Sequence, residues 1–267
     1  MELISGVSVV NSTPVLYIKQ LNAVVFADSH LGFEEEMAKH GLNLPRYQLR
    51  KLLNILNQVF NVIKPKRIII AGDVKHCFNE LSRQERIELR ELFTYLTSLT
   101  SEIIIVKGNH DSYLPLITRR YGIEIIKDYL LENGYLITHG HKEVDVNNID
   151  FKVMIMGHEH PSISLRDELG YTVKFSCYLV APLIQDPSRK VIVLPASGIY
   201  QSGTNVTLDR LSYLSPITKG HVDLENSKPF IVDEDLGVIE LPELKVIHEV
   251  TLKYMHQQLS FNSLEQA

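Results

Sequence analysis

EIIIVKGNHD, residues 102–111, is the stretch that decides the fold. Its first half, 102–106, is a short β-branched run typical of a buried strand, and its second half is the polar cluster Gly108-Asn109-His110-Asp111. Given the composition of the chain, this tetrapeptide is expected by chance in about one such sequence in a thousand. Ligand sites in open α/β sheets lie beyond the carboxyl ends of strands. The stretch therefore predicts an α/β fold with a polar site at a strand end.

Four further apolar runs lead into polar clusters in the same way. Strands are expected at 23–27, 67–71, 135–138 and 153–156, and they are followed by Asp28-Ser29-His30, Gly72-Asp73, His139-Gly140-His141 and Gly157-His158-Glu159-His160. If these strands are neighbours in a sheet, all five clusters reach one crevice. Positions i and i+2 of an extended segment lie on one side, so Asp28 would face the same point as His30, and His158 the same point as His160.

The remaining pattern places helices and further strands around this set. Apolar residues at helical spacing after Pro45 predict one helix, and the capping-box pattern of Ser82 and Glu85 predicts the start of another. Asn133-Gly134 predicts a hairpin, and strands are expected near 171–180 and 190–194. We expect a main domain over residues 1–220, with residues 221–267 adding accessory strands and a short helix near 246–259, packed on the same domain.

Composition limits the class of protein. The chain has 267 residues, 45% of them hydrophobic and 22% charged, which is typical of a soluble globular protein. The net charge of -5 argues against a protein-wide basic field for binding nucleic acid. No secretory signal or membrane span is expected, and two cysteines suit a reducing compartment, so the predicted location is cytoplasmic, without a membrane partner.

The polar clusters predict a metal centre. They hold seven candidate ligands without cysteine: Asp28, His30, Asp73, Asn109, His139, His158 and His160. Imidazole and carboxylate ligands suit Mn, Fe, Zn, Ni or Co, whereas a sulfur-rich set would indicate structural zinc. A lone histidine or Gly-Asp pair is more often a surface or turn residue, but here each falls after a strand. Seven ligands are too many for one ion, so we expect two divalent ions about 3.5–4 Å apart, as in two-metal hydrolases.

These motifs, in this order, resemble the calcineurin-like metallophosphoesterase superfamily. More narrowly, Ala27-Asp28-Ser29-His30-Leu31-Gly32-Phe33, Gly72-Asp73-Val74-Lys75-His76, Gly157-His158-Glu159-His160-Pro161 and Leu194-Pro195-Ala196 resemble archaeal SbcD-related, ICC-like phosphoesterases. The resemblance implies an α/β sandwich of two facing mixed sheets flanked by helices.

The resemblance also implies a role for each residue. Asp28, His30 and His160 would hold the first ion and Asn109, His139 and His158 the second, with Asp73 bridging. His110 would face the substrate and protonate the leaving oxygen, while a metal-bridging hydroxide attacks. Manganese is the preferred ion. His141 is the alternative ligand to His139, and Lys75, His76 and Lys107 are candidate phosphate contacts.

The expected function is therefore a binuclear metal-dependent phosphoesterase, with a nuclease-like phosphodiesterase preferred. Its substrate would be a phosphodiester, and both nucleic acid and nucleotides are candidates. A homo-oligomer is a candidate assembly. The alternatives are a nucleotide or small-molecule phosphomonoesterase and a non-catalytic scaffold of the same fold. A scaffold would be expected to lack ligands or the catalytic histidine, whereas all seven positions and His110 are present.

Overall fold

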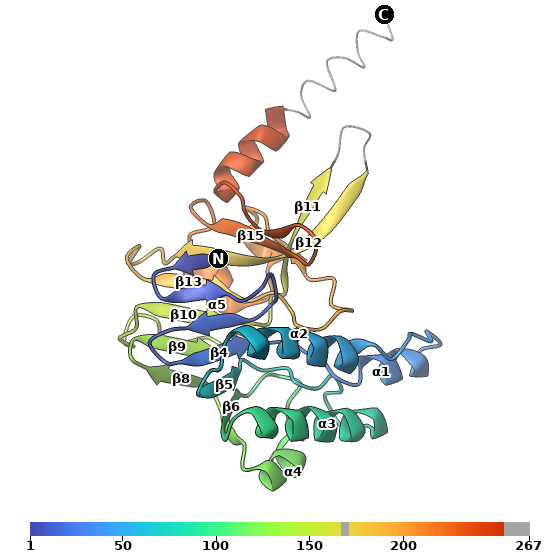
Figure 1. The fold of residues 1–267 in the computed structure, drawn as a ribbon. Coiled ribbons are helices and arrows are strands. Elements are labelled where there is room, and N and C mark those ends of the chain that lie inside the picture. Colours follow the sequence, from blue (N-terminus) through green and yellow to red (C-terminus); the bar gives the residue numbers. More distant parts are fainter. Residues whose placement is uncertain (167–170, 254–267) are drawn as a thin grey trace, which may run out of the picture.

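The computed structural model describes residues 1–166 and 171–253, which fold into two facing β-sheets flanked by helices (Figure 1). This arrangement confirms the predicted fold class. The first sheet has the order β1 (Glu2–Ile4), β2 (Val7–Val9), β3 (Leu16–Ile18), β4 (Ala23–Phe26), β5 (Arg67–Ile70), β6 (Glu102–Val106) and β7 (Glu124–Ile126). Strands β1 to β4 pair antiparallel, and β4 to β7 pair parallel.

The second sheet is also mixed. Its order is β14 (Thr204–Asn205), β11 (Pro161–Arg166), β12 (Thr172–Pro182), β13 (Lys190–Val193), β10 (Val153–Met156), β9 (Tyr135–Thr138) and β8 (Tyr129–Glu132). Strand β15 (Lys228–Asp233) pairs with β12 and with β16 (Gly237–Glu240). The predicted hairpin is confirmed, since β8 and β9 pair antiparallel around Asn133-Gly134.

Helices flank the two sheets (Figure 1). They are α1 (Phe33–Lys39), α2 (Gln48–Val62), α3 (Arg83–Leu99), α4 (Pro115–Thr118) and α5 (Pro216–His221), with 3-10 turns at Arg119–Tyr121 and Arg210–Ser212. The predicted capping box is confirmed at the start of α3, where the Ser82 side chain accepts from Glu85 N and the Glu85 side chain accepts from Ser82 N. Helix α2 begins at Gln48, three residues after Pro45.

Alternation along the central strands explains the layers. In β5, Ile68 and Ile70 pack with α2 and α3, whereas Ile69 faces the second sheet and packs with Ile155 and Ile192. Because successive side chains of a strand point to opposite faces, a fully apolar strand is required wherever both faces are covered. A third apolar cluster lies on the outer face of the second sheet.

The two-sheet arrangement corrects one expectation. The five polar clusters do not follow neighbouring strands of one sheet, because β4, β5 and β6 belong to the first sheet and β9 and β10 to the second. The carboxyl ends of both parallel sets point to the same end of the sandwich, so the clusters still meet there.

The C-terminal part extends the second sheet. Strands β15 and β16 form the accessory pair, and residues 244–253 are helical. The expected helix near 246–259 is thus present as far as residue 253, and its remainder lies outside the described residues. Within residues 1–166 and 171–253, no helix combines the length and apolar character needed to span a bilayer.

Candidate metal centre

Backbone hydrogen bonds draw the loops after β4, β5 and β10 together. Asp28 N donates to Gly72 O at 3.0 Å, and His30 N donates to Asp73 O at 3.0 Å. From the second sheet, His158 N donates to the Asp28 carboxylate at 3.0 Å. These bonds fix the loop that holds Asp28 and His30 between the other two. The side chains of three separate chain segments therefore converge on one point.

The loop residues share an unusual backbone conformation. Five of the predicted ligands have left-handed φ values, namely 57° for Asp28, 43° for His30, 51° for Asp73, 71° for His158 and 46° for His160. For a residue with a Cβ this conformation costs on the order of 1–2 kcal/mol, and such strain gathers at functional sites. The extended i, i+2 argument was therefore wrong about the backbone. Asp28 and His30 do fall in one group, but His158 and His160 fall in two.

Close approach explains two of the glycines. A Cβ on Gly72 would lie 2.5 Å from His139 Nδ1, and a Cβ on Gly108 would lie 2.1 Å from Asp73 Oδ1. A real Cβ essentially never makes non-bonded contacts of that length, so a side chain at either position would displace a predicted ligand. Glycine at these motif positions is therefore required by packing around the site.

Asp28, His30 and His160 form the first group of potential ligands. The His160 Nε2 atom lies 3.2 Å from Asp28 Oδ1 and 3.3 Å from His30 Nε2. Asp28 is fully buried, and its Oδ1 atom has no hydrogen-bond partner within the described residues. A buried carboxylate oxygen without a donor costs several kcal/mol unless a cation compensates it. This group fits a divalent ion.

Asp73, His139 and His158 form the second group, with Asn109 beside it. The His139 Nδ1 atom lies 2.9 Å from Ala71 O, which can accept only if Nδ1 carries the proton. When the imidazole is neutral, that tautomer directs the lone pair of Nε2 toward Asp73 Oδ2 at 3.2 Å and Asn109 Oδ1 at 3.1 Å. Three acceptor atoms then face one another, an arrangement that a cation satisfies. This group also fits a divalent ion.

The electrostatics of the predicted ligands are mixed. Burial by itself would lower the pKa of His139, but the charge of Asp73 outweighs it and raises the pKa to about 9, so this imidazole must lose a proton before it can bind a metal ion. Burial lowers the pKa of His30 well below its usual value, and burial with the neighbouring His139 lowers the pKa of His158 to about 4. Both imidazoles are therefore neutral at pH 7. Burial by itself would raise the pKa of Asp73, but the charge of His139 and its hydrogen bond outweigh it, and the net shift is downward. Neutral imidazole and ionised carboxylate are the forms required of metal ligands.

His110 lies beside these groups and lines a cavity of about 460 Å³. Its backbone N–H donates to Asp73 Oδ1 at 2.9 Å, and its Nε2 lies 3.7 Å from Asp73 Oδ2. Its Nδ1 contacts the carbonyl of His76, and the ring of Phe78 covers it with centroids 3.6 Å apart. The imidazole is thus oriented from two sides while remaining next to Asp73.

Of the candidate phosphate contacts, His76 lines the cavity and Lys75 does not. The structure buries Lys75 completely, and its ammonium donates to the carbonyls of Cys77 and Glu80. This placement does not bring Lys75 to the cavity, because the side chain is used to hold its own loop. His76 does line the cavity, and its Nδ1 lies 3.4 Å from His30 Nδ1.

The histidine after His139 is not brought into either ligand group. The rings of His139 and His141 have centroids 5.2 Å apart, and His141 Nδ1 is buried without a hydrogen-bond partner within the described residues. Burial with the nearby His139 lowers the pKa of His141 to about 4. The geometry therefore favours His139 as the ligand and leaves His141 beside it.

Two other residues support the loops from behind. Asp111 does not orient His110 through its side chain. Its carboxylate accepts from the backbone N–H groups of Asp73, Val74 and Gly108, each at 2.9 Å. The Glu159 carboxylate accepts from Leu214 N and Ser215 N. Both carboxylates bind loops rather than the reacting centre.

Gln48, the first residue of α2, is a supporting residue that the sequence did not reveal. Its amide donates to Ser29 O at 2.7 Å and His30 O at 3.0 Å, and its carbonyl accepts from Ile199 N at 3.2 Å. Gln48 thereby joins the loop after β4 to the loop that follows residue 195. No motif surrounds it, so only the folded chain shows this contact.

A family model described as calcineurin-like phosphoesterase matches residues 21–209, which contain every candidate ligand. The chain belongs to the calcineurin-like phosphoesterase family. It is therefore a metal-dependent phosphoester hydrolase by family, and its folded ligand groups are consistent with that chemistry. No curated protein matches the sequence at a significant level.

A solved structure supports the fold of this calcineurin-like phosphoesterase. A nuclease from Pseudomonas putida is similar with a TM-score of 0.62 and 16% identity, over 90% of this chain and 98% of the nuclease. At that identity the likeness establishes the fold alone. A predicted phosphoesterase from Streptococcus pneumoniae has a TM-score of 0.32 and 13% identity, over 81% of this chain and 91% of that one, and adds no argument.

Proposed function

We propose that this calcineurin-like phosphoesterase is a binuclear, manganese-dependent phosphodiesterase of the SbcD-related, nuclease-like kind. The observation that carries the proposal is the pair of ligand groups, Asp28–His30–His160 and Asp73–His139–His158, which lie side by side with acceptor atoms facing one another. Asn109 adds an oxygen to the second group. Oxygen and imidazole ligands without sulfur suit Mn²⁺.

The chain divides the remaining work among few residues. Bound ions would supply a nucleophile at neutral pH and neutralise the phosphoryl oxygens. Asp73 Oδ2 lies 3.2 Å from His139 Nε2 in the second group and 3.9 Å from His30 Nε2 in the first, which supports the proposal that Asp73 would contact both ions. His110 lines the cavity and would give its proton to the leaving oxygen. Burial lowers the pKa of His110, so its imidazolium is a stronger acid than that of a free histidine but is the minor form at neutral pH.

The cavity wall favours a diester over a monoester. None of the described residues that line the cavity beside His110 is a lysine or an arginine. A monoester carries one more negative charge than a diester, and cationic side chains are what usually bind such a group. A diester needs less compensation. It also has a substituent on each side of the phosphate, for which the open cavity leaves room.

The test compares both substrate classes under controlled metal content. Exhaustive chelation should abolish hydrolysis of bis(p-nitrophenyl) phosphate, and Mn²⁺ should restore it. p-Nitrophenyl phosphate should be the poorer substrate by kcat/KM. Undiminished turnover after chelation would refute the metal mechanism, whereas a preference for the monoester would refute only the diesterase assignment.

His110→Ala separates catalysis from metal binding. We expect a loss of about 10²- to 10⁴-fold in kcat, the usual worth of a general acid, with two ions still bound. His248→Ala is the matched control, because His248 is an exposed histidine in the helix of residues 244–253. If His110→Ala lost a metal ion, His110 would instead be a ligand.

A further inference from the structure

Two aromatic side chains stand at the rim of the candidate centre. Phe33, the first residue of α1, stacks on Tyr200 with ring centroids 5.6 Å apart and an interplanar angle of 15°. His76 contacts the Phe33 ring edge-to-face at 4.8 Å. Phe33 and Tyr200 are both half-buried and both line the cavity that contains His30, His110 and His160. The pair therefore presents aromatic surface to whatever occupies that cavity.

Tyr200 is held in place by a hydrogen bond as well as by its stack on Phe33. Its hydroxyl donates to Pro45 O at 2.5 Å. The loop that contains Tyr200 is hydrogen-bonded at both ends to loops that carry predicted ligands. Gly198 N donates to Asp28 O, and Thr204 N donates to His160 O. Fixing the ring before binding lowers the entropic cost of a stacking contact. The ring position is thus coupled to the same loops that hold the first ligand group.

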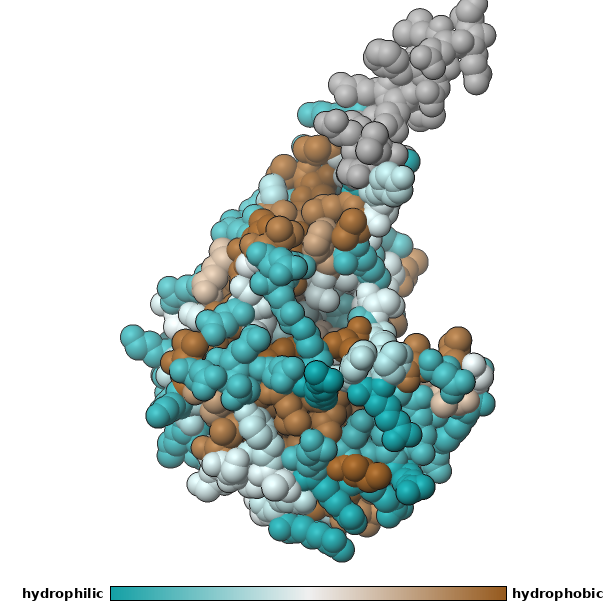
Figure 2. Space-filling model, turned by 45° about the vertical axis from the view of Figure 1, so that its right-hand side comes forward, coloured by the Kyte–Doolittle hydropathy of each residue, from teal (hydrophilic) through white to brown (hydrophobic). Residues whose placement is uncertain are grey.

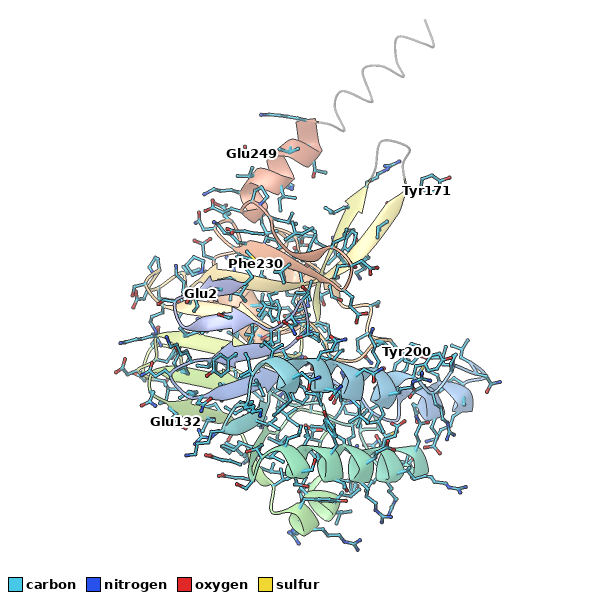
Figure 3. All side chains as sticks on the ribbon, in the orientation of Figure 1. Glu2, Glu132, Tyr171, Tyr200, Phe230 and Glu249 are labelled. Atoms are coloured by element: carbon cyan, nitrogen blue, oxygen red, sulfur yellow. The ribbon has the colours of Figure 1, made fainter. Side chains whose placement is uncertain are left out.

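The surface around this pair is open and short of cations. Figure 2 shows the molecule hollowed between the part that contains α1 and the upper part that contains β11 and β12. Figure 3 shows Tyr200 beside α1 and Tyr171 far from it, at the end of the β11–β12 hairpin. The described residues that line the cavity offer aromatic faces, imidazoles, hydroxyls, the Gln201 amide and the Glu159 carboxylate, but no lysine or arginine. Ring faces are therefore available there without a lysine or arginine beside them.

We infer that Phe33 and Tyr200 form a stacking platform for one nucleobase of the substrate, next to the phosphodiester that is cleaved. The inference rests on the proposed phosphodiesterase function and adds the substrate class. A flat ring can extend an existing aromatic stack face to face, whereas an alkyl group cannot. A base must be unpaired on at least one face to do so, so the substrate is a nucleotide diester or an unstacked base in a strand. Stacking of this kind tolerates any base.

The test uses two diesters with the same leaving group and Mn²⁺-loaded protein. Thymidine 5′-(p-nitrophenyl phosphate) contains a base, and methyl p-nitrophenyl phosphate does not. The wild-type protein should prefer the thymidine ester in kcat/KM by about 5- to 150-fold, the range that base–aromatic stacking supplies. Tyr200→Leu and Phe33→Leu should each reduce that preference at least fivefold. Tyr200→Phe should restore most of it, because the ring remains.

Tyr171→Leu is the control for loss of an aromatic residue elsewhere, since Tyr171 is 70% exposed at the hairpin. It should leave the preference as in the wild type. Melting temperature and metal content of each variant report whether the site is still folded. Equal kcat/KM for the two esters in the wild type, or equal losses on both esters in folded Tyr200→Leu, would overturn the platform. Failure of every form to cleave either ester would instead refute the proposed function.

Discussion

Replacing Asp111 by asparagine should disable the centre although no predicted ligand is substituted. Asp111 is fully buried, and each of its carboxylate oxygens accepts backbone N–H groups. One oxygen accepts from Asp73 N and Gly108 N at 2.9 Å, and the other from Val74 N at 2.9 Å and Lys75 N at 3.4 Å. Asparagine keeps one oxygen and presents an amide N–H₂ in place of the other. Two backbone donors therefore lose their acceptor in either orientation.

The expected cost follows from that count. Leaving a buried donor without an acceptor costs about 1–3 kcal/mol, so Asp111→Asn should lower the free energy of unfolding by about 2–6 kcal/mol. The loss falls on the loop that contains Asp73, the residue between the two ligand groups. We therefore expect weaker metal binding and lower activity in any Asp111→Asn protein that remains folded.

Urea unfolding followed by circular dichroism measures the change, and mass spectrometric metal analysis gives the ions bound per chain. Asp145→Asn is the matched control, because exposed Asp145 accepts from Asn148 N within its own turn. Its unfolding midpoint should stay close to that of the wild type. An Asp111→Asn protein with a wild-type midpoint and two tightly bound ions would refute the reasoning.

Three more variants test the same framework. Gly108→Ala would place a Cβ 2.1 Å from Asp73 Oδ1 and 2.4 Å from Asp73 N, so it should destabilise the fold by about 1–3 kcal/mol and leave fewer than two bound ions by metal analysis. Gln48→Leu removes the donors to the loop of His30 and should weaken binding of one ion by about 10- to 100-fold in titration calorimetry. Burial raises the pKa of Glu88 to about 7. The folded state therefore becomes less stable as pH rises from about 4.5 to about 7, because the Glu88 carboxyl loses its proton at a lower pH in the unfolded state. Glu88→Gln should flatten that decline by about 3 kcal/mol between pH 4 and pH 8 in urea unfolding, and an unchanged slope would refute this origin.

Local patterns predicted the central elements because their signals are short-range. The runs that became β6, β9 and β10 were bounded correctly, since apolar runs end where polar clusters begin. The Ser82 capping box fixed the start of α3 for a similar reason. The three-residue strands β1 to β3 were not predicted, because a strand that short has no measurable periodicity.

The sequence by itself determined which residues could form the centre, since metal-binding side chains follow apolar runs in a fixed order and chemistry restricts their partners. Tertiary structure decided which of these residues lie together in each ligand group. Left-handed turns, invisible to an alternation argument, separate His158 from His160, and the meeting of two sheets, rather than one, brings the five clusters together. The fold also made the Asp111 carboxylate an acceptor for backbone N–H groups of the loop after β5. Each of these depends on contacts between residues distant in the chain, and no local pattern encodes such contacts.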